Sequence, residues 1–394
     1  MAAVELKDID IVFGRNVKRA LAMIDAGATR DEILAETGQV LGAAGVNIAI
    51  PRGSICVLMG LSGSGKSTVL RAVNGLNQVA RGTVLVEHEG RQVDVARCDE
   101  ATLRAVRTRS VTMVFQQFAL LPWRTVRENV GFGLELRGIA APERNRIVDE
   151  KLEMVGLTKW ADKHAHELSG GMQQRVGLAR AFATEADILL MDEPFSALDP
   201  LIRDKLQDEL LELQEKLHKT IVFVSHDLDE ALKLGNKIAI MESGRIVQAG
   251  TGEEILLHPA TPYVAEFVKH MNPLNVLRGN SLMKPASTLP RRNGAVLLDP
   301  DGHAQVALDP QDRPVGCTLD GRRGSLTACD AETGKVENER ADIIVAPVDL
   351  RLRDAIALKR QTNHPILLVD QLGRLAGLCD DEEIYRGLLR RDAA

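Results

Sequence analysis

A glycine-rich segment, GLSGSGKST at residues 60–68, is the feature that most constrains the fold of this chain. It directly follows residues 46–58, whose pattern predicts a strand, a turn and then a buried strand. The residues from Lys66 onward continue in a helical pattern. A glycine-rich loop between a buried strand and a helix is the arrangement that binds phosphate groups. We therefore expect an α/β fold with an anion site where this strand ends.

Each kind of residue in this segment suits a nucleoside triphosphate. Glycine lets the backbone fold round the phosphates with its N–H groups pointing inward, and the start of the helix adds partial positive charge. Lys66 brings a full positive charge to the β and γ phosphates, and the hydroxyl of Ser67 is a ligand for Mg²⁺. The residues expected to bind the nucleotide are Gly60, Leu61, Ser62, Gly63, Ser64, Gly65, Lys66, Ser67 and Thr68.

Two adjacent carboxylates, Asp192 and Glu193, end the apolar run that begins at residue 187. Ligands of open α/β sheets lie at the carboxyl ends of the strands, where the phosphate-binding loop also lies. Asp192 is expected to hold Mg²⁺, and Glu193 to act as the general base that polarises the attacking water. Two acids that merely cap the following helix are the alternative, but capping explains one carboxylate and not its coincidence with the loop.

The other patterns complete one large domain. Residues 220–226 predict a second buried parallel strand, and residues 81–95 predict a hairpin. Residues from about 123 to 175 are mostly helical, which predicts a helical subdomain. Residues 201–219 carry leucines three and four positions apart, so we expect a crossover helix packed on the sheet.

An amphipathic segment at residues 17–38 interrupts this domain near its start. Thr29 with Glu32 fits a capping box, and Gly38 fits a helix C-terminus. The segment is therefore expected to be a helical insert. Its role stays open between a structural addition and a binding element.

The chain of 394 residues is long enough for a second, smaller unit, which we expect after residue 272. Residues 280–340 are rich in Pro, Gly, Asp and Arg, and they predict either a linker or a poorly patterned small domain. From Ile343 the pattern predicts strand, helix, strand, turn, strand and helix, which is a compact α/β module.

Composition argues against several classes of protein. The net charge of −6 gives no polybasic footprint for nucleic acid. No stretch approaches the roughly 20 apolar residues that cross a bilayer, and the acidic start differs from a signal peptide, so the chain is expected in the cytoplasm. The five cysteines include no CxxC pair and the nine histidines show no metal-ligand spacing, so buried free thiols are expected.

A further string, LSGGMQQR at 168–175, resembles the signature motif of ABC ATPases. The order of the motifs also resembles that superfamily, with FQQ at 115–117, SALD at 196–199 and SH at 225–226. This resemblance implies a P-loop NTPase (ABC ATPase) domain with antiparallel β and helical subdomains over residues 1–272, and it implies ATP and Mg²⁺ as cofactors.

In such ATPases two copies pair head to tail, so the resemblance implies a dimer of this chain. Ser169, Gly170 and Gly171 of one copy would close on the γ-phosphate held by the loop of the other. The two glycines permit close approach of the backbone, and the helix that starts there aims its dipole at the phosphate. Asp199 would bridge the two copies.

The resemblance also gives roles to three further residues. Gln116 would contact Mg²⁺ and the attacking water, and His226 would orient water and phosphate. With Glu193 and Lys66 they would form the catalytic set. Phe13 would stack on adenine, although the insert separates it unusually far from the loop, and a Phe that only packs in the core is the alternative.

The insert, residues 57–76 and residues 115–130 together resemble ATPase subunits of bacterial glycine betaine, proline betaine and choline importers. Residues 71–77, RAVNGLN, and the short divergent tail most resemble the choline branch. This implies an ATP-hydrolysing subunit that energises import of a quaternary amine. Its partners would be a permease at the cytoplasmic face of the inner membrane and, indirectly, a periplasmic binding protein. An ABC transporter for another substrate or direction, or a soluble ABC ATPase unrelated to transport, are the alternatives.

That family usually carries paired regulatory modules of the cystathionine β-synthase type in its C-terminal region. Residues 343–394 resemble a single module of this kind. Residues 273–342 depart from the pattern, which implies a linker or a degenerate regulatory region. Sensing of a nucleotide or of ionic strength, and a merely structural, dimer-supporting role, both stay open.

Overall fold

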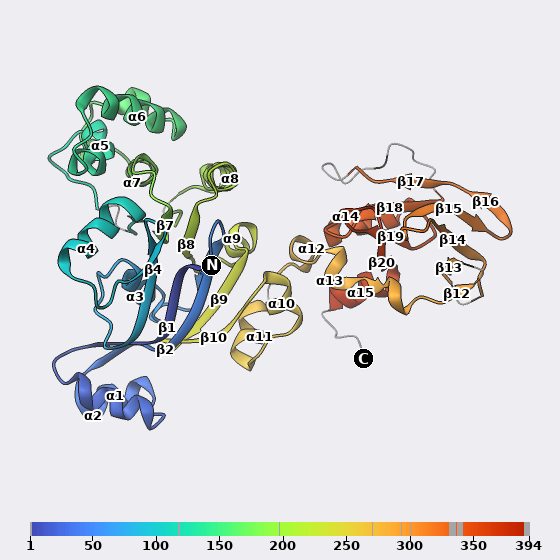
Figure 1. Ribbon diagram of the computed structural model, residues 1–394, viewed down its shortest axis with the longest axis horizontal. Coiled ribbons are helices and arrows are strands. Elements are labelled where there is room, and N and C mark those ends of the chain that lie inside the picture. The colour runs from blue at the N-terminus through green and yellow to red at the C-terminus, as the bar shows by residue number, and fades with distance from the viewer. Residues whose placement is uncertain are drawn as a thin grey trace. The chain divides into compact units, whose positions relative to one another are not determined.

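The apolar run directly before the glycine-rich loop forms β3 (Ile55–Met59), near the middle of a six-stranded sheet in the computed structural model (Figure 1). The structure describes residues 2–389 except 117–118, 197, 270, 293, 300, 331–335 and 337–341. Gln117 and Ala197 of the short motifs, and parts of the expected segments 273–342 and 343–394, lie outside the described residues.

The chain divides into two compact units, Met1–Gly252 and Glu253–Ala394. The sequence led us to expect the first domain to run to residue 272, so the observed division comes earlier. The difference arises because α10 (Gly252–Leu257) and α11 (Pro262–Val268) belong with the second unit. Their short amphipathic pattern gave no sign of which unit they pack on.

The six-stranded sheet has the order β10-β9-β3-β8-β7-β6. All its neighbouring strands are parallel except β10, which pairs antiparallel with β9. Every residue of β3, β7 and β8 is buried, as continuous apolar runs require in a parallel sheet covered on both faces. The other strands are β6 (Val111–Val114), β7 (Ile188–Asp192), β8 (Thr220–Val224), β9 (Lys237–Glu242) and β10 (Arg245–Gly250).

A second, antiparallel sheet with the order β2-β1-β4-β5 completes the β structure of the first unit. The expected hairpin is present, and Glu89 and Gly90 at its turn both have positive φ, as a two-residue type I′ turn requires. Helix α3 contacts strands of both sheets and so lies between them. The strands are β1 (Ala2–Phe13), β2 (Val40–Pro51), β4 (Arg81–His88) and β5 (Arg91–Asp94), and α3 spans Lys66–Val73.

The remaining helices of the sheet region are α4 (Glu100–Ala105), which runs into a π-helical turn at Val106–Ser110, α8 (Pro200–Leu217) and α9 (Leu228–Leu234). Leu206 and Leu210 of α8 are buried, as the leucine spacing predicted. Leu217 is 51% exposed, so the buried stripe ends before the last turn of the helix.

Three helices form the expected helical subdomain, which Figure 1 draws in shades of green. Its own core includes Val130, Leu152 and Val176, one residue from each helix. The helices are α5 (Val126–Leu136), α6 (Ala141–Met154) and α7 (Gly170–Ala183). The subdomain therefore extends beyond the expected end at residue 175.

The insert folds as two helices, α1 (Val17–Asp25) and α2 (Arg30–Thr37), which Figure 1 shows beyond the ends of β1 and β2. The capping box of Thr29 with Glu32 is present, and Gly38 adopts φ 65° at the end of α2. Apolar residues fix the insert to the sheet, since Ile24 and Ile33 are buried in one cluster with Leu41 of β2.

The second unit contains the predicted module, with β18 (Ile343–Pro347), α14 (Leu352–Lys359), β19 (Ile366–Val369), β20 (Leu375–Cys379) and α15 (Asp381–Leu389). These strands belong to a five-stranded sheet of order β11-β20-β19-β18-β17. Helix α14 contacts β19, α15 contacts β20, and the two helices contact each other, so they cover one face of the sheet.

The described part of residues 273–342 is not a linker. Five short strands form an antiparallel sheet of order β12-β13-β14-β15-β16, and its Val296 and Val306 share a core with Ile343 and Leu367. The sequence obscured these strands because they are two to six residues long. Their bounds, with the neighbouring short elements, are α12 Pro273–Val276, α13 Gly279–Leu282, β11 Lys284–Pro285, β12 Arg291–Arg292, β13 Ala295–Leu297, β14 Ala304–Leu308, β15 Pro314–Leu319, β16 Arg322–Gly324 and β17 Leu326–Ala328.

Candidate nucleotide site

A cavity of about 460 Å³ opens over the glycine-rich loop. Most of its wall comes from the loop itself, the ends of β1 and β2, and the carboxyl end of the large sheet. The lining residues are Phe13, Arg30, Val40, Gly42, Ser62, Gly63, Gly65, Lys66, Ser67, Thr68, Gln116, Glu193 and His226. The volume is in the range of small-molecule sites.

Glycine is required at two points of the loop. Gly60 has φ 144°, and a Cβ there would lie 2.2 Å from the carbonyl oxygen of Met241. Gly65 has φ 101°, and its Cβ would lie 2.5 Å from the carbonyl oxygen of Gly42. A side chain at either position would therefore be strained and would push the loop away from its neighbours. Gly65 is also the N-cap of α3, and the first N–H groups of a helix are free to bind an anion.

Lys66 lies within the loop with its side chain buried. Its Nζ donates to the carbonyl oxygens of Gly60 (2.9 Å) and Leu61 (3.0 Å). Burial lowers the pKa of the Lys66 ammonium, while the charges of Glu193 and Asp192 oppose that shift. A desolvated cation of this kind attracts phosphate more strongly than one in water.

Asp192 is fully buried at the end of β7 and holds two partners. The hydroxyl of Ser67 donates to its Oδ1 (2.7 Å), and Nη2 of Arg71 donates to its Oδ2 (2.9 Å). The hydroxyl and the carboxylate, together with the amide of Gln116 on the cavity wall, are the hard oxygen ligands that Mg²⁺ prefers. The residues present therefore fit a magnesium ion.

Glu193 brings the other two expected catalytic residues together. Nε2 of Gln116 donates to its Oε2 (3.2 Å), and Nδ1 of His226 lies 3.4 Å from the same oxygen. The backbone of Glu193 has φ 48°, an unusual conformation for a residue other than glycine, and its N–H donates to the carbonyl oxygen of Val224 (3.1 Å). Strained backbone held in place by the sheet is common where catalytic groups must be aimed.

Phe13 lines the cavity at the end of β1, with 42% of its surface exposed. The insert does not carry Phe13 away from the loop, although it separates the two in the sequence. Phe13 pairs with Val40 across β1 and β2, and the insert projects beyond these strands. Gly42 makes room for the ring, since a Cβ there would lie 2.7 Å from Cε2 of Phe13. Stacking of adenine on Phe13 stays a prediction.

The residues expected to act on a second copy of the chain lie outside this cavity. Ser169 caps α7 by accepting from the N–H of Met172 (3.4 Å), and Asp199 caps α8 by accepting from the N–H of Ile202 (3.1 Å). Ser169, Gly170 and Asp199 are exposed. Neither these residues nor Gly171 are among the residues that line the cavity. They are thus available to a second molecule.

Gly60, Leu61 and Ser64 are loop residues that do not line the cavity. Gly60 and Leu61 accept the bonds of Lys66, and Ser64 is buried with no partner for its hydroxyl within the described part of the chain. Binding of the nucleotide by these three residues stays a prediction.

Sequence reasoning missed four residues, namely Arg30, Val40, Gly42 and Arg71. Arg71 could have been found, because it lies four residues after Ser67 on α3 and so shares its face of the helix. The others reach the cavity only through the pairing of β1 with β2 and the packing of the insert, which no local pattern reveals.

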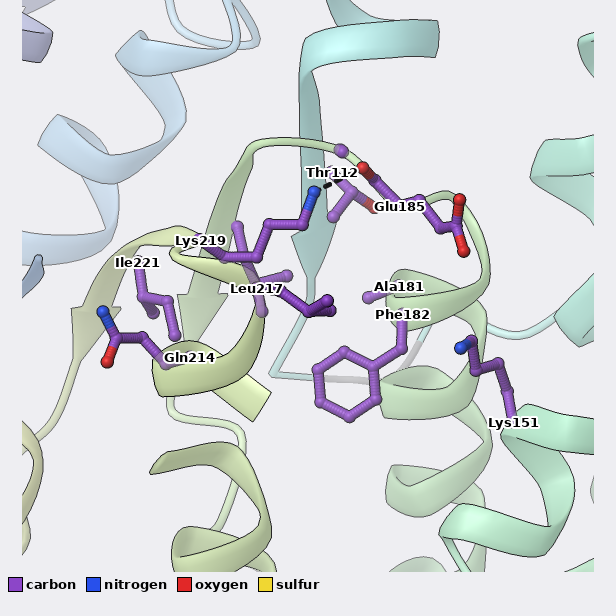
Figure 2. A pocket seen from close by; sticks show the side chains of 11 residues that line it. Thr112, Lys151, Ala181, Phe182, Glu185, Gln214, Leu217, Lys219 and Ile221 are labelled. Atoms are coloured by element: carbon purple, nitrogen blue, oxygen red, sulfur yellow. Dashed lines mark hydrogen bonds between the residues drawn. The ribbon is translucent and has the colours of Figure 1, made fainter. Parts of the chain in front are cut away.

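A second hollow, shown in Figure 2, has a volume of about 40 Å³ and a mostly apolar wall that includes Phe182, Leu217 and Ile221. Lys219 reaches across it and donates to the carbonyl oxygen of Glu185 (2.7 Å). This space is large enough only for water, so it does not compete with the cavity over the loop as a nucleotide site.

Among residues that the structure describes, no group of three or more His, Cys, Asp or Glu side chains could hold a metal ion by themselves. Across the same residues, no helix is both long and apolar enough to cross a membrane.

Comparison with known proteins gives consistent matches. A family profile described as ABC transporter matches residues 43–196. The glycine betaine/proline betaine transport system ATP-binding protein ProV of Escherichia coli K12 is 40% identical over 98% of this chain and 95% of its own length. The glycine betaine transport ATP-binding protein OpuAA of Bacillus subtilis 168 is 39% identical over 98% of this chain and 91% of its own.

Among solved structures, the dimeric structure of MJ0796, a bacterial ABC transporter cassette, matches with a TM-score of 0.55 and 29% identity. The match covers 63% of this chain and 98% of that one. The loop, the carboxylate pair and the full-length relatives agree, and this chain belongs to the family of ABC transporter ATP-binding subunits that includes the glycine betaine/proline betaine transport proteins.

Proposed function

We propose that this chain hydrolyses ATP to power import of a quaternary amine through a separate permease. The observation that carries the substrate class is the similarity to ProV and OpuAA over 98% of this chain, which includes the insert and the second unit. Glycine betaine and proline betaine, named for those relatives, are therefore the first candidates. Choline, which residues 71–77 and the short divergent tail favoured, stays a candidate to be tested beside them.

The residues that line the cavity suggest how hydrolysis proceeds. The N–H groups of the loop and Lys66 bind the β and γ phosphates and offset the charge that develops there. Glu193 accepts the proton of the attacking water, and Gln116 and His226, which both contact its Oε2, orient water and phosphate. A magnesium ion held through Ser67, Gln116 and Asp192 would neutralise charge on the phosphates.

Phe13 is proposed to stack on the adenine ring. Its exposed face at the cavity wall and the space that Gly42 leaves beside it support this role. An aromatic platform recognises the flat base, while the loop recognises the phosphates, so the two ends of the nucleotide are bound by different parts of the chain.

Hydrolysis is proposed to require two copies. Ser169 and Gly170 are exposed at the start of α7 and absent from the cavity wall of their own chain. A helix N-terminus presents free N–H groups and partial positive charge, which suits a phosphate held by the other copy. The dimeric cassette of the related MJ0796 structure supports this arrangement.

The permease is expected to contact the helical subdomain, at the cytoplasmic face of the membrane. Trp123, in the segment that follows Gln116, is 71% exposed, and Leu136 at the end of α5 is 62% exposed. Large exposed apolar side chains on a helical lobe favour a protein partner. A periplasmic binding protein would deliver the amine to that permease.

The role of the second unit stays a prediction. The order of β18, α14, β19, β20 and α15 agrees with the order expected of a module of the cystathionine β-synthase type. Support of the paired state and sensing of a nucleotide or of ionic strength both remain to be tested.

The test is uptake of labelled glycine betaine, proline betaine and choline by cells that express the complete transporter. The control carries Glu193→Gln in this subunit. We expect uptake of at least one compound, abolished in the control. No uptake of any of the three, with ATP hydrolysis intact, would contradict the quaternary amine assignment and leave a transporter of another substrate.

A further inference from the structure

We propose that Arg30, a residue of the helical insert, binds the phosphate groups of the nucleotide held by the glycine-rich loop. The insert is then part of the ATP site and not a structural addition alone. This inference rests on the proposed function, because it takes the cavity over the loop as the nucleotide site.

The geometry places Arg30 at the edge of the loop. Arg30 is the first residue of α2 and is one of the residues that line the cavity. Its Nη1 donates to the carbonyl oxygen of Gly63, in the middle of the glycine-rich loop. The two residues are 33 positions apart in the chain, so the contact depends on how the insert packs against β1 and β2.

The position of Arg30 is fixed on both sides of the residue. The side chain of Thr29 accepts from the N–H of Glu32, and the side chain of Glu32 accepts from the N–H of Thr29 (2.7 Å), which sets where α2 begins. Ile33, three residues after Arg30, is fully buried in the cluster that joins the insert to β1 and β2. A residue held in this way brings its charge to the loop with little loss of freedom on binding.

The charge of Arg30 is not matched by an acidic neighbour. Within the described part of the chain, no carboxylate oxygen lies within 4.0 Å of its guanidinium nitrogens. By contrast, Arg19 of the same insert lies 3.6 Å from a carboxylate oxygen of Glu36. A guanidinium has five N–H donors, and the bond to Gly63 uses one, so Arg30 retains donors for a ligand.

A phosphate is the ligand that fits this arrangement. The planar guanidinium forms paired hydrogen bonds with phosphate oxygens, and it keeps its charge at every physiological pH. The adjacent Lys66 is a point charge already bonded to two carbonyl oxygens of the loop. Arg30 therefore adds a second full positive charge, from a different element, to the same cavity wall.

A purely structural role is the alternative, in which Arg30 only holds the loop through the carbonyl of Gly63. The two roles make different demands on the side chain. The neutral amide of glutamine can still donate a hydrogen bond to the carbonyl of Gly63, but it has no positive charge. Lysine keeps the positive charge but lacks the planar guanidinium. Arg30→Gln thus separates the two roles, and Arg30→Lys tests whether charge alone suffices.

The experiment is a titration of the purified full-length chain with a fluorescent ATP analogue, with EDTA present so that no hydrolysis occurs. The variants are Arg30→Gln, Arg30→Lys and, as the matched control in the same insert, Arg19→Gln. A Lys66→Ala variant reports on the loop itself, and thermal melting of each variant shows that it is folded.

We expect Arg30→Gln to weaken binding by about tenfold or more, Arg30→Lys to recover most of that loss, and Arg19→Gln to bind like the unmodified chain. Unchanged affinity of Arg30→Gln, with Lys66→Ala weakened, would overturn this inference and leave the proposed function intact. No binding by the unmodified chain, or no effect of Lys66→Ala, would overturn both.

Discussion

Ser67 and Asp192 lie 125 residues apart in the chain, yet the hydroxyl of Ser67 donates a 2.7 Å hydrogen bond to Oδ1 of Asp192. Ser67 is in the first turn of α3, which follows β3, and Asp192 ends β7, with β8 between the two strands in the sheet. The parallel order of these strands therefore brings both oxygens to one edge of the sheet. A single Mg²⁺ ion can reach both of them.

This pair predicts the metal dependence of hydrolysis. Ser67→Ala should lower ATPase activity by about a hundredfold and raise the Mg²⁺ concentration needed for half-maximal rate, because one oxygen ligand is lost. The measurement is the ATPase rate as a function of Mg²⁺. Ser54→Ala, which removes a hydroxyl just before β3 that donates to the carbonyl of Pro51, is the control. An unchanged Mg²⁺ requirement in Ser67→Ala would argue against this site.

The exposed signature residues predict complementation between two inactive variants. Lys66→Ala disables the loop, and Ser169→Arg blocks the start of α7, so each should be inactive alone. In a mixture, the mixed dimer contains one site that carries both defects and one site that carries neither. We expect ATPase activity to return on mixing, up to about half of that of an unmodified dimer for each mixed dimer formed.

Activity that stays absent in the mixture, with dimers detected by size-exclusion chromatography, would mean that each site uses the loop and signature of a single chain. The control is each variant alone, taken through the same mixing procedure. The result bears directly on the head-to-tail pairing proposed above.

Because the carboxylate of Asp10 is buried, we predict that replacing its partner Arg81, outside the nucleotide site, lowers the stability of the fold. Arg81 donates from Nε to Oδ2 of Asp10 (2.6 Å), and its Nη2 lies 2.7 Å from Oδ1 of Asp25 on the insert. Arg81→Met leaves Asp10, which is 1% exposed, without its cation. Because Arg81 is itself partly exposed, we expect a loss of about 1–3 kcal/mol in the free energy of unfolding.

Part of this effect should depend on pH. The hydrogen bond to Arg81 lowers the pKa of Asp25 below its ordinary value of 3.8, so the stabilisation from that pair is present above pH 3.8 and is lost as pH falls below it. Urea unfolding of Arg81→Met and of the exposed control Arg91→Met, followed at neutral and acidic pH, checks both points. Equal stability of the two variants at neutral pH would contradict the prediction.

We predict that the five cysteine thiols react slowly with thiol reagents in the folded chain. Burial raises the pKa of both Cys56 and Cys379 to about 12, and it also raises the pKa of Cys98, Cys317 and Cys329. The thiolate is the reactive form, so at pH 8 the folded chain should react slowly with Ellman's reagent and the unfolded chain quickly. Cys98, the least buried, should react first, and Cys98→Ser should remove that phase. Rapid reaction of several thiols in the folded chain would contradict this.

Much of the site could be predicted because it is built from short segments with strong local chemistry. The backbone of the loop has φ angles of 144° at Gly60 and 101° at Gly65, a local requirement that favours glycine, so the pattern is visible in the sequence. Asp192 and Glu193 end a fully buried apolar strand, which marks their place in a parallel sheet. The capping box of Thr29 with Glu32 is equally local.

Other parts could not be predicted because they depend on contacts between distant segments. Arg30 reaches Gly63 only after the insert packs on β1 and β2 through Ile24 and Ile33. The strands from β12 to β16 are too short for alternation to stand out, and they are held by a core shared with Ile343 and Leu367. The end of the first unit at Gly252 likewise follows from packing and not from composition.

The most direct test of the central account concerns Glu193, whose carboxylate meets both Gln116 and His226. The measurement is phosphate release, together with retention of labelled ATP, by the full-length chain carrying Glu193→Gln. We predict that the variant binds Mg-ATP and retains it, while phosphate release falls on the order of a hundredfold or more. Phosphate release at the rate of the unmodified chain would contradict the assignment of Glu193 as the general base.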